Sequence, residues 1–442
     1  MTPTFVQEPA RAIEVIHQCD VLVLGSGPGG LAAALAAART GVSVTLVERF
    51  GCFGGNITVV GVEGLAWYRH EKTVEAMGAA SPESQSLSYE IDSEGFKLVA
   101  DRLVQEAGIH PMLHRLVVAP IMDGDQLKGV IVESKAGREA ILAHRIIDAT
   151  GDADIAHRAG AITHTTPVEQ MQAASVMFHL AGVDKARFMA GVREDPQTYA
   201  DWATGEWKIE TSGKEDKMFS PFLKKPFAQA LQAGIIPAHL TTIAGTWGAM
   251  LDSGELTYMN LVHLAGCDGT DPDSMTQQEI EGRSQAMLAI EALKRFTPGC
   301  ENARLRNFGM TIGIRDTRKI DAVYNLTEHD VREQARFEDS IGIYPEFIDG
   351  YGILILPTTG RYMHIPYRSM LPKGVKNLLV TGRAIGGDRI SHAATRNMAC
   401  CAVAGQGAGI AAALSVKSGV ALDAVSIPAV QQELARQGVR YQ

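Results

Sequence analysis

The chain has 442 residues, of which 46% are hydrophobic and 21% charged, and its formal net charge is −9. This balance is typical of a globular protein with a sizeable core, and it excludes disordered, collagen-like and coiled-coil chains. Because acidic residues outnumber basic ones and no long basic run occurs, we expect neither nucleic acid nor a membrane surface as a partner.

The six cysteines are spaced too irregularly for a CxxC metal or redox motif, so we expect no metal site. The N-terminal segment lacks the basic start and apolar core of a signal peptide. The chain also has no run of about 18 uninterrupted apolar residues. Together these features predict a cytoplasmic location.

The N-terminal part of the chain carries a strand, turn and helix pattern. Residues 20–24 (DVLVL) predict a buried parallel strand, and a G-x-G-x-x-G turn follows at residues 25–30. Residues 31–39 are strong helix formers, and residues 42–47 predict a second strand. This is the structural context in which a glycine-rich turn binds a dinucleotide.

Each glycine of the turn has a separate physical task. Gly25 permits the tight turn, Gly27 lets the backbone approach a diphosphate, and Gly30 allows close helix–strand packing. Glu48 ends the second strand, where a carboxylate accepts hydrogen bonds from ribose hydroxyl groups and repels the 2′-phosphate of NADP. The segment therefore predicts a dinucleotide site.

The rest of the predicted cofactor domain is discontinuous in sequence. Residues 116–120, 127–133 and 140–148 predict a meander of three short strands. Much later in the chain, residues 377–380 predict one more apolar strand, followed by glycine. An Ala/Gly-rich helix is expected over residues 405–418.

These pieces resemble the FAD-dependent oxidoreductases of the glutathione-reductase-like fold, and more closely a subgroup with a GGN-x-T segment. The matching motifs are GSGPGG, GCFGGNIT, IIDATGDAD, IGIRDTRKI, IPYRSMLPKG, NLLVTGRAI and CAVAGQGAGIAAAL. The resemblance implies FAD as cofactor. It also implies a set of FAD-binding residues, which are Gly25, Gly27, Pro28, Gly29, Gly30, Glu48, Arg49, Gly54, Gly55, Asn56, Val118, Thr150, Gly151, Gly382 and Arg383.

The implied fold class is α/β, with a Rossmann-like FAD-binding domain that contains a β-meander and is interrupted by an inserted α+β substrate domain. We assign residues 15–160 and 361–425 to the FAD-binding domain, 161–360 to the substrate domain and 426–442 to a C-terminal tail. In the insert, Thr276 and Glu279 form the pattern of a capping box for a helix that ends near Phe296. Residues 198–226 are interpreted as a surface excursion or lid.

Two features differ from the disulfide reductases that share this fold. Those enzymes carry a CxxxxC pair, whereas here only Cys52 is present, and a small buried residue explains it best. The chain also has no second G-x-G-x-x-G after a convincing strand. We therefore expect electrons to be exchanged directly with substrate, a quinone, dioxygen or a protein carrier.

The predicted catalytic residues are His392, Arg396 and Arg389, which follow the Gly382 turn. The H-x-A-x-R spacing is similar to the H-G-A-N-R segment of fumarate reductases and L-aspartate oxidases, where the arginine meets a substrate carboxylate. We expect His392 to act as acid or base and the two arginines to clamp an anion. The alternatives are a structural histidine, and arginines that pair with the loop or with the FAD phosphates.

Four other polar residues are predicted to have structural roles. Arg315 and Asp316 are expected to pair with each other at a domain junction. Tyr351 and His364 are expected to serve packing or the surface.

The leading functional hypothesis is an FAD-dependent oxidoreductase that transfers a hydride between flavin and a small, carboxylate-bearing substrate. A flavin monooxygenase that uses NAD(P)H and dioxygen is the first alternative. An FAD-bearing RNA-modification protein is a second alternative, which the acidic charge disfavours. The expected partners are a small-molecule substrate and an unidentified electron donor or acceptor, and a homo-oligomer stays open.

Overall fold

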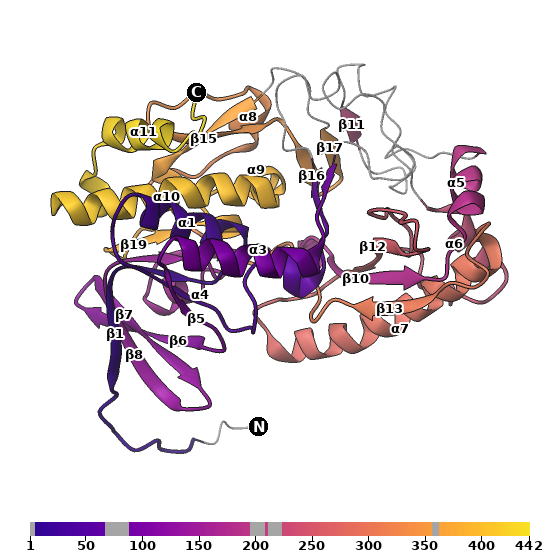
Figure 1. Cartoon of the computed structure of the whole chain (residues 1–442), viewed down its shortest axis with the longest axis horizontal. Coiled ribbons are helices and arrows are strands. Elements are labelled where there is room, and N and C mark those ends of the chain that lie inside the picture. The colour runs from indigo at the N-terminus through magenta and orange to yellow at the C-terminus, as the bar shows by residue number, and fades with distance from the viewer. Residues whose placement is uncertain (1–4, 67–87, 195–207, 211–222, 356–361) are drawn as a thin grey trace.

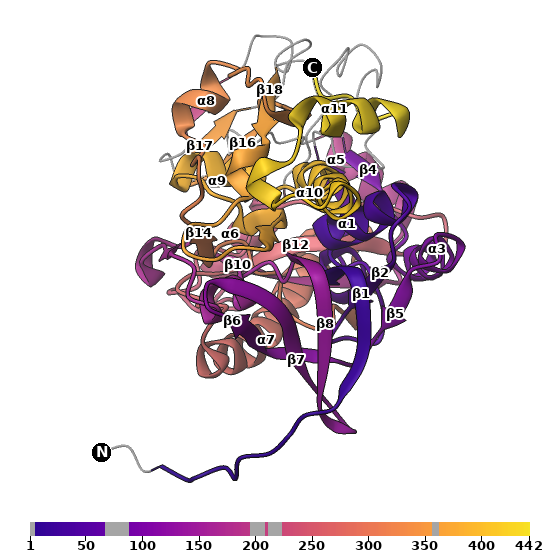
Figure 2. The same ribbon diagram turned by 90° about the vertical axis from the view of Figure 1, so that its left-hand side faces the viewer.

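The computed structural model describes residues 5–66, 88–194, 208–210, 223–355 and 362–442. The elements gather into two lobes, which lie on the left and the right of Figure 1. An N-terminal arm extends away from the body in both ribbon views (Figures 1 and 2). The predicted excursion at residues 198–226 lies largely outside the described residues.

The larger lobe is built on one sheet with the strand order β5-β2-β1-β8-β7-β6, to which β19 adds by pairing with β8. Strands β1, β2, β5, β8 and β19 are parallel, whereas β6, β7 and β8 form the predicted antiparallel meander. The bounds are β1 Val15–Leu24, β2 Val44–Val47, β5 His110–Met112, β6 Leu116–Asp123, β7 Gln126–Ser134, β8 Gly137–Asp148 and β19 Leu378–Val380. The sequence-based fold class is confirmed.

Helices cover this sheet, as Figure 2 shows. They are α1 Pro28–Arg39, α3 Ser93–Glu106, α4 Asp154–Arg158, α9 Arg389–Thr395, α10 Met398–Ser418 and α11 Ile427–Arg436. Helix α10 packs backbone to backbone on α1, since a Cβ at Gly405 or Gly409 would overlap the carbonyl oxygen of Gly29 or Ala33. By length and composition α10 would also pass for a membrane span, yet 67% of its apolar window is buried inside the protein.

The predicted C-terminal tail contains a packed helix. In α11 the side chains of Val430 and Leu434 are fully buried in the core that also holds α1 and α10. The same core includes Ile341 and Ile365, which lie in the antiparallel pair of β15 and β18. Elements of this region are α8 Glu328–Arg332, β15 Ser340–Pro345, β16 Ile348–Gly350, β17 Ile353–Ile355 and β18 Tyr362–Pro366.

The described part of the smaller lobe contains a sheet of order β12-β10-β13 and the helices α5, α6 and α7. Their bounds are β10 Ala174–Ala181, β12 Leu256–Leu264, β13 Arg304–Phe308, α5 Lys185–Glu194, α6 Lys225–Gln232 and α7 Pro272–Phe296. Short strands elsewhere are β3 Gly64–Ala66, β4 Ser88–Glu90, β9 Thr163–Thr165, β11 Lys208–Glu210 and β14 Arg318–Ile320.

The predicted capping box at Thr276 is wrong. Helix α7 begins four residues earlier, where Asp271 caps the amide of Asp273 and Pro272 occupies the first helical turn. Thr276 lies inside the helix and donates its hydroxyl hydrogen to the carbonyl oxygen of Pro272. Proline suits the first turn because its missing N–H group would have no partner there.

The two faces of the smaller sheet have different neighbours. Gly282 of α7 approaches the side chains of Val176 and Leu264 so closely that a Cβ would overlap Val176. Met177 follows Val176 in β10 and pairs with Asn260 of β12, so their side chains point to the opposite face. That opposite face is turned toward the larger lobe.

Candidate functional site

Four parallel strands end at the same edge of the large sheet. Leu24 of β1 is in register with both Val47 of β2 and Asp148 of β8, and Asp148 is in register with Val380 of β19. Ligands of open α/β sheets bind beyond the carboxyl ends of the strands. Most of the predicted cofactor residues follow these four strand ends directly.

The glycine turn after β1 forms an open cradle at the start of α1. Gly25 has φ +92°, and a Cβ there would overlap the carbonyl oxygen of Ala149. The amides of Gly29 and Gly30 lie in the first turn of α1 behind Pro28, where no helical carbonyl precedes them. A Cβ at Gly27 would meet no atom within 4 Å, so the backbone faces free space.

Glu48 is fixed against this turn by hydrogen bonds. Its Oε2 atom accepts from the amide of Ser26 at 2.9 Å and from the Ser26 hydroxyl at 2.6 Å, and Oε1 accepts from the Phe50 amide at 3.0 Å. A carboxylate offers about four acceptor positions, so one remains for a ribose hydroxyl. The neighbouring Arg49 is exposed and stacks over Phe50 at 4.7 Å.

The second glycine cluster packs on the first. The Gly54 amide donates to the carbonyl oxygen of Ser26 at 3.0 Å, and a Cβ at Gly55 would lie 2.6 Å from the Cα atom of Gly27. Asn56 then opens a one-turn π-helix, η1, which spans Asn56–Val60. The GGN segment thus lies beside the first glycine turn.

The remaining predicted residues, apart from Val118, follow β8 and β19. The Thr150 amide and hydroxyl both donate to Asp148, and Gly151 turns with φ +88° beneath the Arg383 guanidinium group. A Cβ on Gly29 would lie 3.2 Å from the Cα atom of Gly382. Val118 lies farther off, in β6, two strands away from β8 in the sheet.

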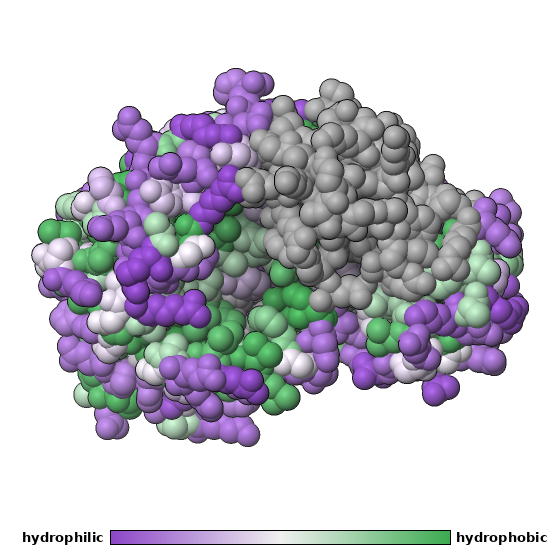
Figure 3. Space-filling view, turned by 45° about the horizontal axis from the view of Figure 1, so that its top comes forward, coloured by the Kyte–Doolittle hydropathy of each residue, from purple (hydrophilic) through white to green (hydrophobic). Residues whose placement is uncertain are grey.

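These residues fit an extended dinucleotide. The Thr381 hydroxyl and the Arg383 Nε–H group are buried beside the turns without a hydrogen-bond partner, although buried polar groups normally have one. Open space faces Gly382 as well as Gly27. A diphosphate with its ribose groups would supply acceptors and donors where the structure leaves them unmatched. In Figure 3, green apolar residues gather in the middle of the molecule, next to the residues drawn in grey.

A strap of residues 309–319 joins this region to the smaller lobe. The Met310 amide donates to the carbonyl oxygen of Val59 in η1 at 2.7 Å. Further on, the Gly313 amide donates to Ser175 at 2.8 Å, and the Thr317 hydroxyl donates to Asp152 at 2.6 Å. Asp152 also pairs with Arg383 at 2.5 Å. The strap therefore holds its side chains between the predicted cofactor site and β10.

Arg315, on the strap, forms no direct ion pair among the described residues, although the charge of Asp349 interacts with it and its guanidinium group approaches His263 Nδ1 at 3.5 Å. It donates to the carbonyl oxygen of Ala173 and to Oδ1 of Asn260, both at 3.2 Å. Burial, reinforced by the positive charge of Arg396, lowers the pKa of Arg315 to about 10. The two guanidinium groups therefore lie close enough to repel each other.

Arg396 is the predicted clamp residue, and the structure brings it to Arg315. It pairs with the Asp349 carboxylate at 3.2 Å and also donates to the Asp349 carbonyl oxygen. Its Nε–H group is buried without a partner, and the same holds for the Oε1 atom of Gln172, whose amide group approaches Asp349. The cluster of Arg315, Arg396 and Asp349 carries one net positive charge, and we call it the arginine cluster.

Two tyrosines near this cluster have unusual backbones. Tyr258 has φ +48° and Tyr351 has φ +53°, a region that residues with a Cβ seldom adopt. Tyr258 interacts electrostatically with Arg315 and Arg396. Such strained residues concentrate at functional sites, where the surrounding structure holds them.

Arg389, another predicted clamp residue, lies on the exposed side of Tyr351. Its guanidinium group stacks over the Tyr351 ring at 4.4 Å and donates to Gln170 at 3.2 Å. Both of these partners are uncharged at neutral pH. These two contacts therefore do not neutralise the positive charge of Arg389.

The expected Arg315–Asp316 pair is wrong. Asp316 instead pairs with Lys319 at 2.7 Å and accepts a hydrogen bond from the Tyr351 hydroxyl. Burial works against the charge of Asp316, yet His392 at 3.6 Å, together with Lys319 and Tyr351, keeps its pKa below the ordinary value. Neighbouring side chains in an extended strap point in opposite directions, so Arg315 faces the smaller sheet while Asp316 faces Lys319.

His392 is 2% exposed and lies behind the arginine cluster. Its Nε2–H group donates to the carbonyl oxygen of Arg315 at 2.9 Å, and its Nδ1 atom is buried without a partner. Burial, reinforced by the charge of Lys319, lowers its pKa to about 3. The imidazole is therefore neutral at physiological pH.

The sequence reasoning missed Tyr258, Asp349 and the strap position of Arg315. The motif IGIRDTRKI had drawn attention to Arg315, but only as an ion-pair residue. A tyrosine within an apolar strand segment carries no signal in a single sequence. Its positive φ is visible only in the folded chain.

The sequence of this chain matches a known protein family. The family profile described as FAD dependent oxidoreductase matches residues 20–434. A digeranylgeranylglycerophospholipid reductase from Methanosphaerula palustris is 23% identical over 353 residues, which are 71% of this chain and 86% of that protein. A 4-oxocyclohex-2-ene-1-carboxylate 5-dehydrogenase from Sinomonas cyclohexanicum is 41% identical over 68 residues, which are 15% of this chain and 11% of that protein.

Among solved structures, a geranylgeranyl bacteriochlorophyll reductase-like protein from Thermoplasma acidophilum is similar with a TM-score of 0.49 and 13% identity. The match covers 97% of this chain and 85% of that one.

Proposed function

Since the chain belongs to the FAD-dependent oxidoreductase family and is an FAD-dependent enzyme, we propose that it exchanges a hydride with a small organic substrate bearing a carboxylate. Bound FAD supplies the two-electron chemistry. We propose that Arg315 and Arg396 hold the substrate carboxylate. The observation that supports this best is the net positive charge of the arginine cluster, whose Arg315 lies on the strap between its contacts to Val59 and Asp152.

The charge argument rests on the partners of each guanidinium group. Arg396 pairs directly with the Asp349 carboxylate, whereas Arg315 donates to two uncharged oxygen atoms and interacts with the Asp349 charge without a direct ion pair. Two half-buried guanidinium groups that share one carboxylate repel each other, and a bound anion would reduce that cost in free energy. A planar carboxylate also matches the fork of donors that a guanidinium group presents.

The cofactor would be held by the residues that surround the strand ends. The amides of Gly29 and Gly30 would bind the diphosphate, and Glu48 would accept from a ribose hydroxyl. Thr381 and Arg383 would bond to the cofactor through the groups that are now unpartnered. The specific membership in a GGN-x-T subgroup stays part of this proposal.

We assign His392 a positioning role in place of proton transfer. Its hydrogen bond fixes the backbone of Arg315, and its Nδ1 atom is buried without a partner. The Tyr258 hydroxyl is the better candidate for a proton donor, because Tyr258 is half-buried beside both guanidinium groups. Arg389 would attract the anion from the outer side of Tyr351.

The names of the relatives agree with the proposal only in part. One relative is named for a carboxylate, but its alignment covers 15% of this chain. The longer match is to a reductase of a phospholipid. The proposal therefore depends on the arginine cluster.

The test compares matched substrates on the FAD-loaded protein under anaerobic conditions. Candidate donors are offered as carboxylic acids and as the corresponding primary amides, and bleaching of the flavin is followed. We expect an acid to reduce the flavin roughly 10- to 100-fold more efficiently than its amide, because the amide forms no charge-assisted pair. Equal rates for acid and amide would contradict the proposal.

A matched pair of variants completes this test. Arg315→Gln should abolish the preference for the acid and leave the flavin content unchanged. Arg306→Gln is the control, since Arg306 is an exposed residue of β13 that pairs with Glu255. Retention of the acid preference in Arg315→Gln would assign the carboxylate to another site.

A further inference from the structure

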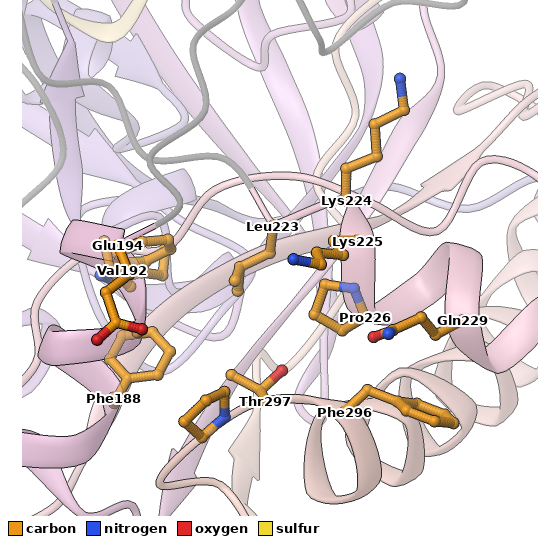
Figure 4. Close-up of a pocket in the computed structure, with 13 residues that line it drawn as sticks. Phe188, Val192, Glu194, Leu223, Lys224, Lys225, Pro226, Gln229, Phe296 and Thr297 are labelled. Carbon is orange, nitrogen blue, oxygen red and sulfur yellow. The ribbon is translucent and has the colours of Figure 1, made fainter.

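A pocket of about 550 Å³ lies in the smaller lobe, between α5, the start of α6 and the C-terminal end of α7 (Figure 4). One wall is apolar, with Phe188, Val192, Leu223 and Trp247, and the charged residues Glu194, Lys224 and Lys225 also line the pocket. The rings of Phe188 and Trp247 meet edge to face at a centroid distance of 5.2 Å. Pockets of this size and lining are typical of small-molecule sites.

Two polar groups in the wall are buried without a partner. The Nε1–H group of Trp247 and the hydroxyl of Thr297 form no hydrogen bond, and the two residues are 1% and 8% exposed. Figure 4 shows the Thr297 hydroxyl directed across the pocket toward Lys225 and Pro226. Buried polar groups nearly always have a partner, so each of these two groups lacks one in the structure.

The pocket is separate from the arginine cluster. Residues 244–250 form an extended segment that pairs with β12, and the Asn260 amide donates to the carbonyl oxygen of Thr246 at 3.0 Å. Asn260 points its side chain to Arg315, on the face turned away from α7. Trp247 is the residue after Thr246, so its side chain points to the opposite face, toward α7.

We infer that this pocket is a second ligand site, for an apolar ring compound with one oxygen atom that accepts hydrogen bonds from Trp247 and Thr297. The aromatic wall takes the ring, and the two unmatched donors take the oxygen. The oxygen can belong to a carbonyl or to a carboxylate, since both accept hydrogen bonds from N–H and O–H donors. The site does not depend on the arginine cluster or on the redox reaction.

The test is equilibrium dialysis of 2-acetylnaphthalene against the FAD-loaded protein. We expect saturable binding of one molecule per chain. We expect 2-ethylnaphthalene, which has the ring but no oxygen, to bind roughly 3- to 10-fold more weakly. Equal binding of the two compounds would overturn the inference. With 2-naphthoate as a third probe, tighter binding than the ketone identifies a carboxylate, and weaker binding identifies a carbonyl.

Variants locate the bound probe. Thr297→Val removes the hydroxyl at constant shape and should weaken 2-acetylnaphthalene roughly 3- to 10-fold. Gln229→Trp fills the pocket from the half-buried side of α6 and should abolish binding. Thr276→Val is the control, because Thr276 lies at the exposed start of α7. Unchanged binding in both pocket variants, with native circular dichroism, would place the probe elsewhere and overturn the inference.

Discussion

His392 and Arg315 are joined by a hydrogen bond from the imidazole Nε2–H group to the Arg315 carbonyl oxygen, at 2.9 Å. The bond links helix α9 of the larger lobe to the strap that carries the arginine cluster. A histidine that was expected to move protons is therefore placed where it orients the residue proposed to bind substrate.

Two substitutions separate these roles of His392. Glutamine can still donate a hydrogen bond from the Nε2 position, whereas leucine cannot. We expect His392→Gln to keep kcat and its pH profile, and His392→Leu to raise KM for the carboxylate substrate with a smaller change in kcat. A fall of roughly 10²- to 10⁴-fold in kcat for both variants would show that His392 is the acid or base.

Acid should destabilise the protein through two buried histidines. Burial lowers the pKa of His392 and of His263 to about 3 from the ordinary value of 6.5. The unfolded chain binds both protons near pH 6.5, so the stability conferred by the neutral imidazoles is complete above that pH and is lost as the pH falls toward 3. We expect the midpoint of thermal unfolding to fall between about pH 7 and pH 5. His392→Gln should show a shallower fall, and an unchanged slope would contradict the assignment.

Glu48 should control the affinity for FAD. Glu48→Gln keeps the shape of the side chain but loses the charge that strengthens hydrogen bonds from Ser26 and from the ribose. We expect the Kd for FAD to rise roughly 10-fold, measured as flavin retained after dialysis. Glu133→Gln, on the surface of β7, is the matched control and should retain FAD like the natural protein.

Gly405 should be required for the contact of α10 with α1. Alanine at a helix position normally stabilises by about 1 kcal/mol relative to glycine. Here a Cβ would overlap the Gly29 carbonyl oxygen, so Gly405→Ala should instead destabilise by about 1–3 kcal/mol in chemical denaturation. Gln406→Ala, one position along on a less buried side, should not destabilise. Stabilisation by Gly405→Ala would show that the two backbones can separate without cost.

The buried pair of Asp316 and Lys319 should be sensitive to the loss of one partner. The two side chains are 0% and 6% exposed, so Asp316→Asn leaves an uncompensated ammonium group inside the protein. We expect a loss of about 3–5 kcal/mol of unfolding free energy. The double variant Asp316→Asn with Lys319→Met should recover a large part of it, and strict additivity of the two changes would contradict the pairing.

Local sequence patterns were sufficient to predict the arrangement of elements that are neighbours both along the chain and in the folded protein. The turn at Gly25, the strand before it and Glu48 lie within one βαβ unit, so their spacing predicted their arrangement. The meander from β6 to β8 was predictable for the same reason, because each strand pairs with the next. The glycines at 405 and 409 were placed in the correct helix, although their contact with α1 was not foreseen.

The sequence by itself therefore determined a dinucleotide-binding α/β lobe and its family, because glycine turns and strand periodicity are local properties. Only the tertiary structure decided that Arg315 meets Arg396, that Asp316 pairs with Lys319, and that Trp247 and Thr297 share a pocket. These groups lie on separate elements or on alternate sides of one extended strand. Which of them come together depends on how the lobes pack, and packing is not encoded in any short stretch of residues.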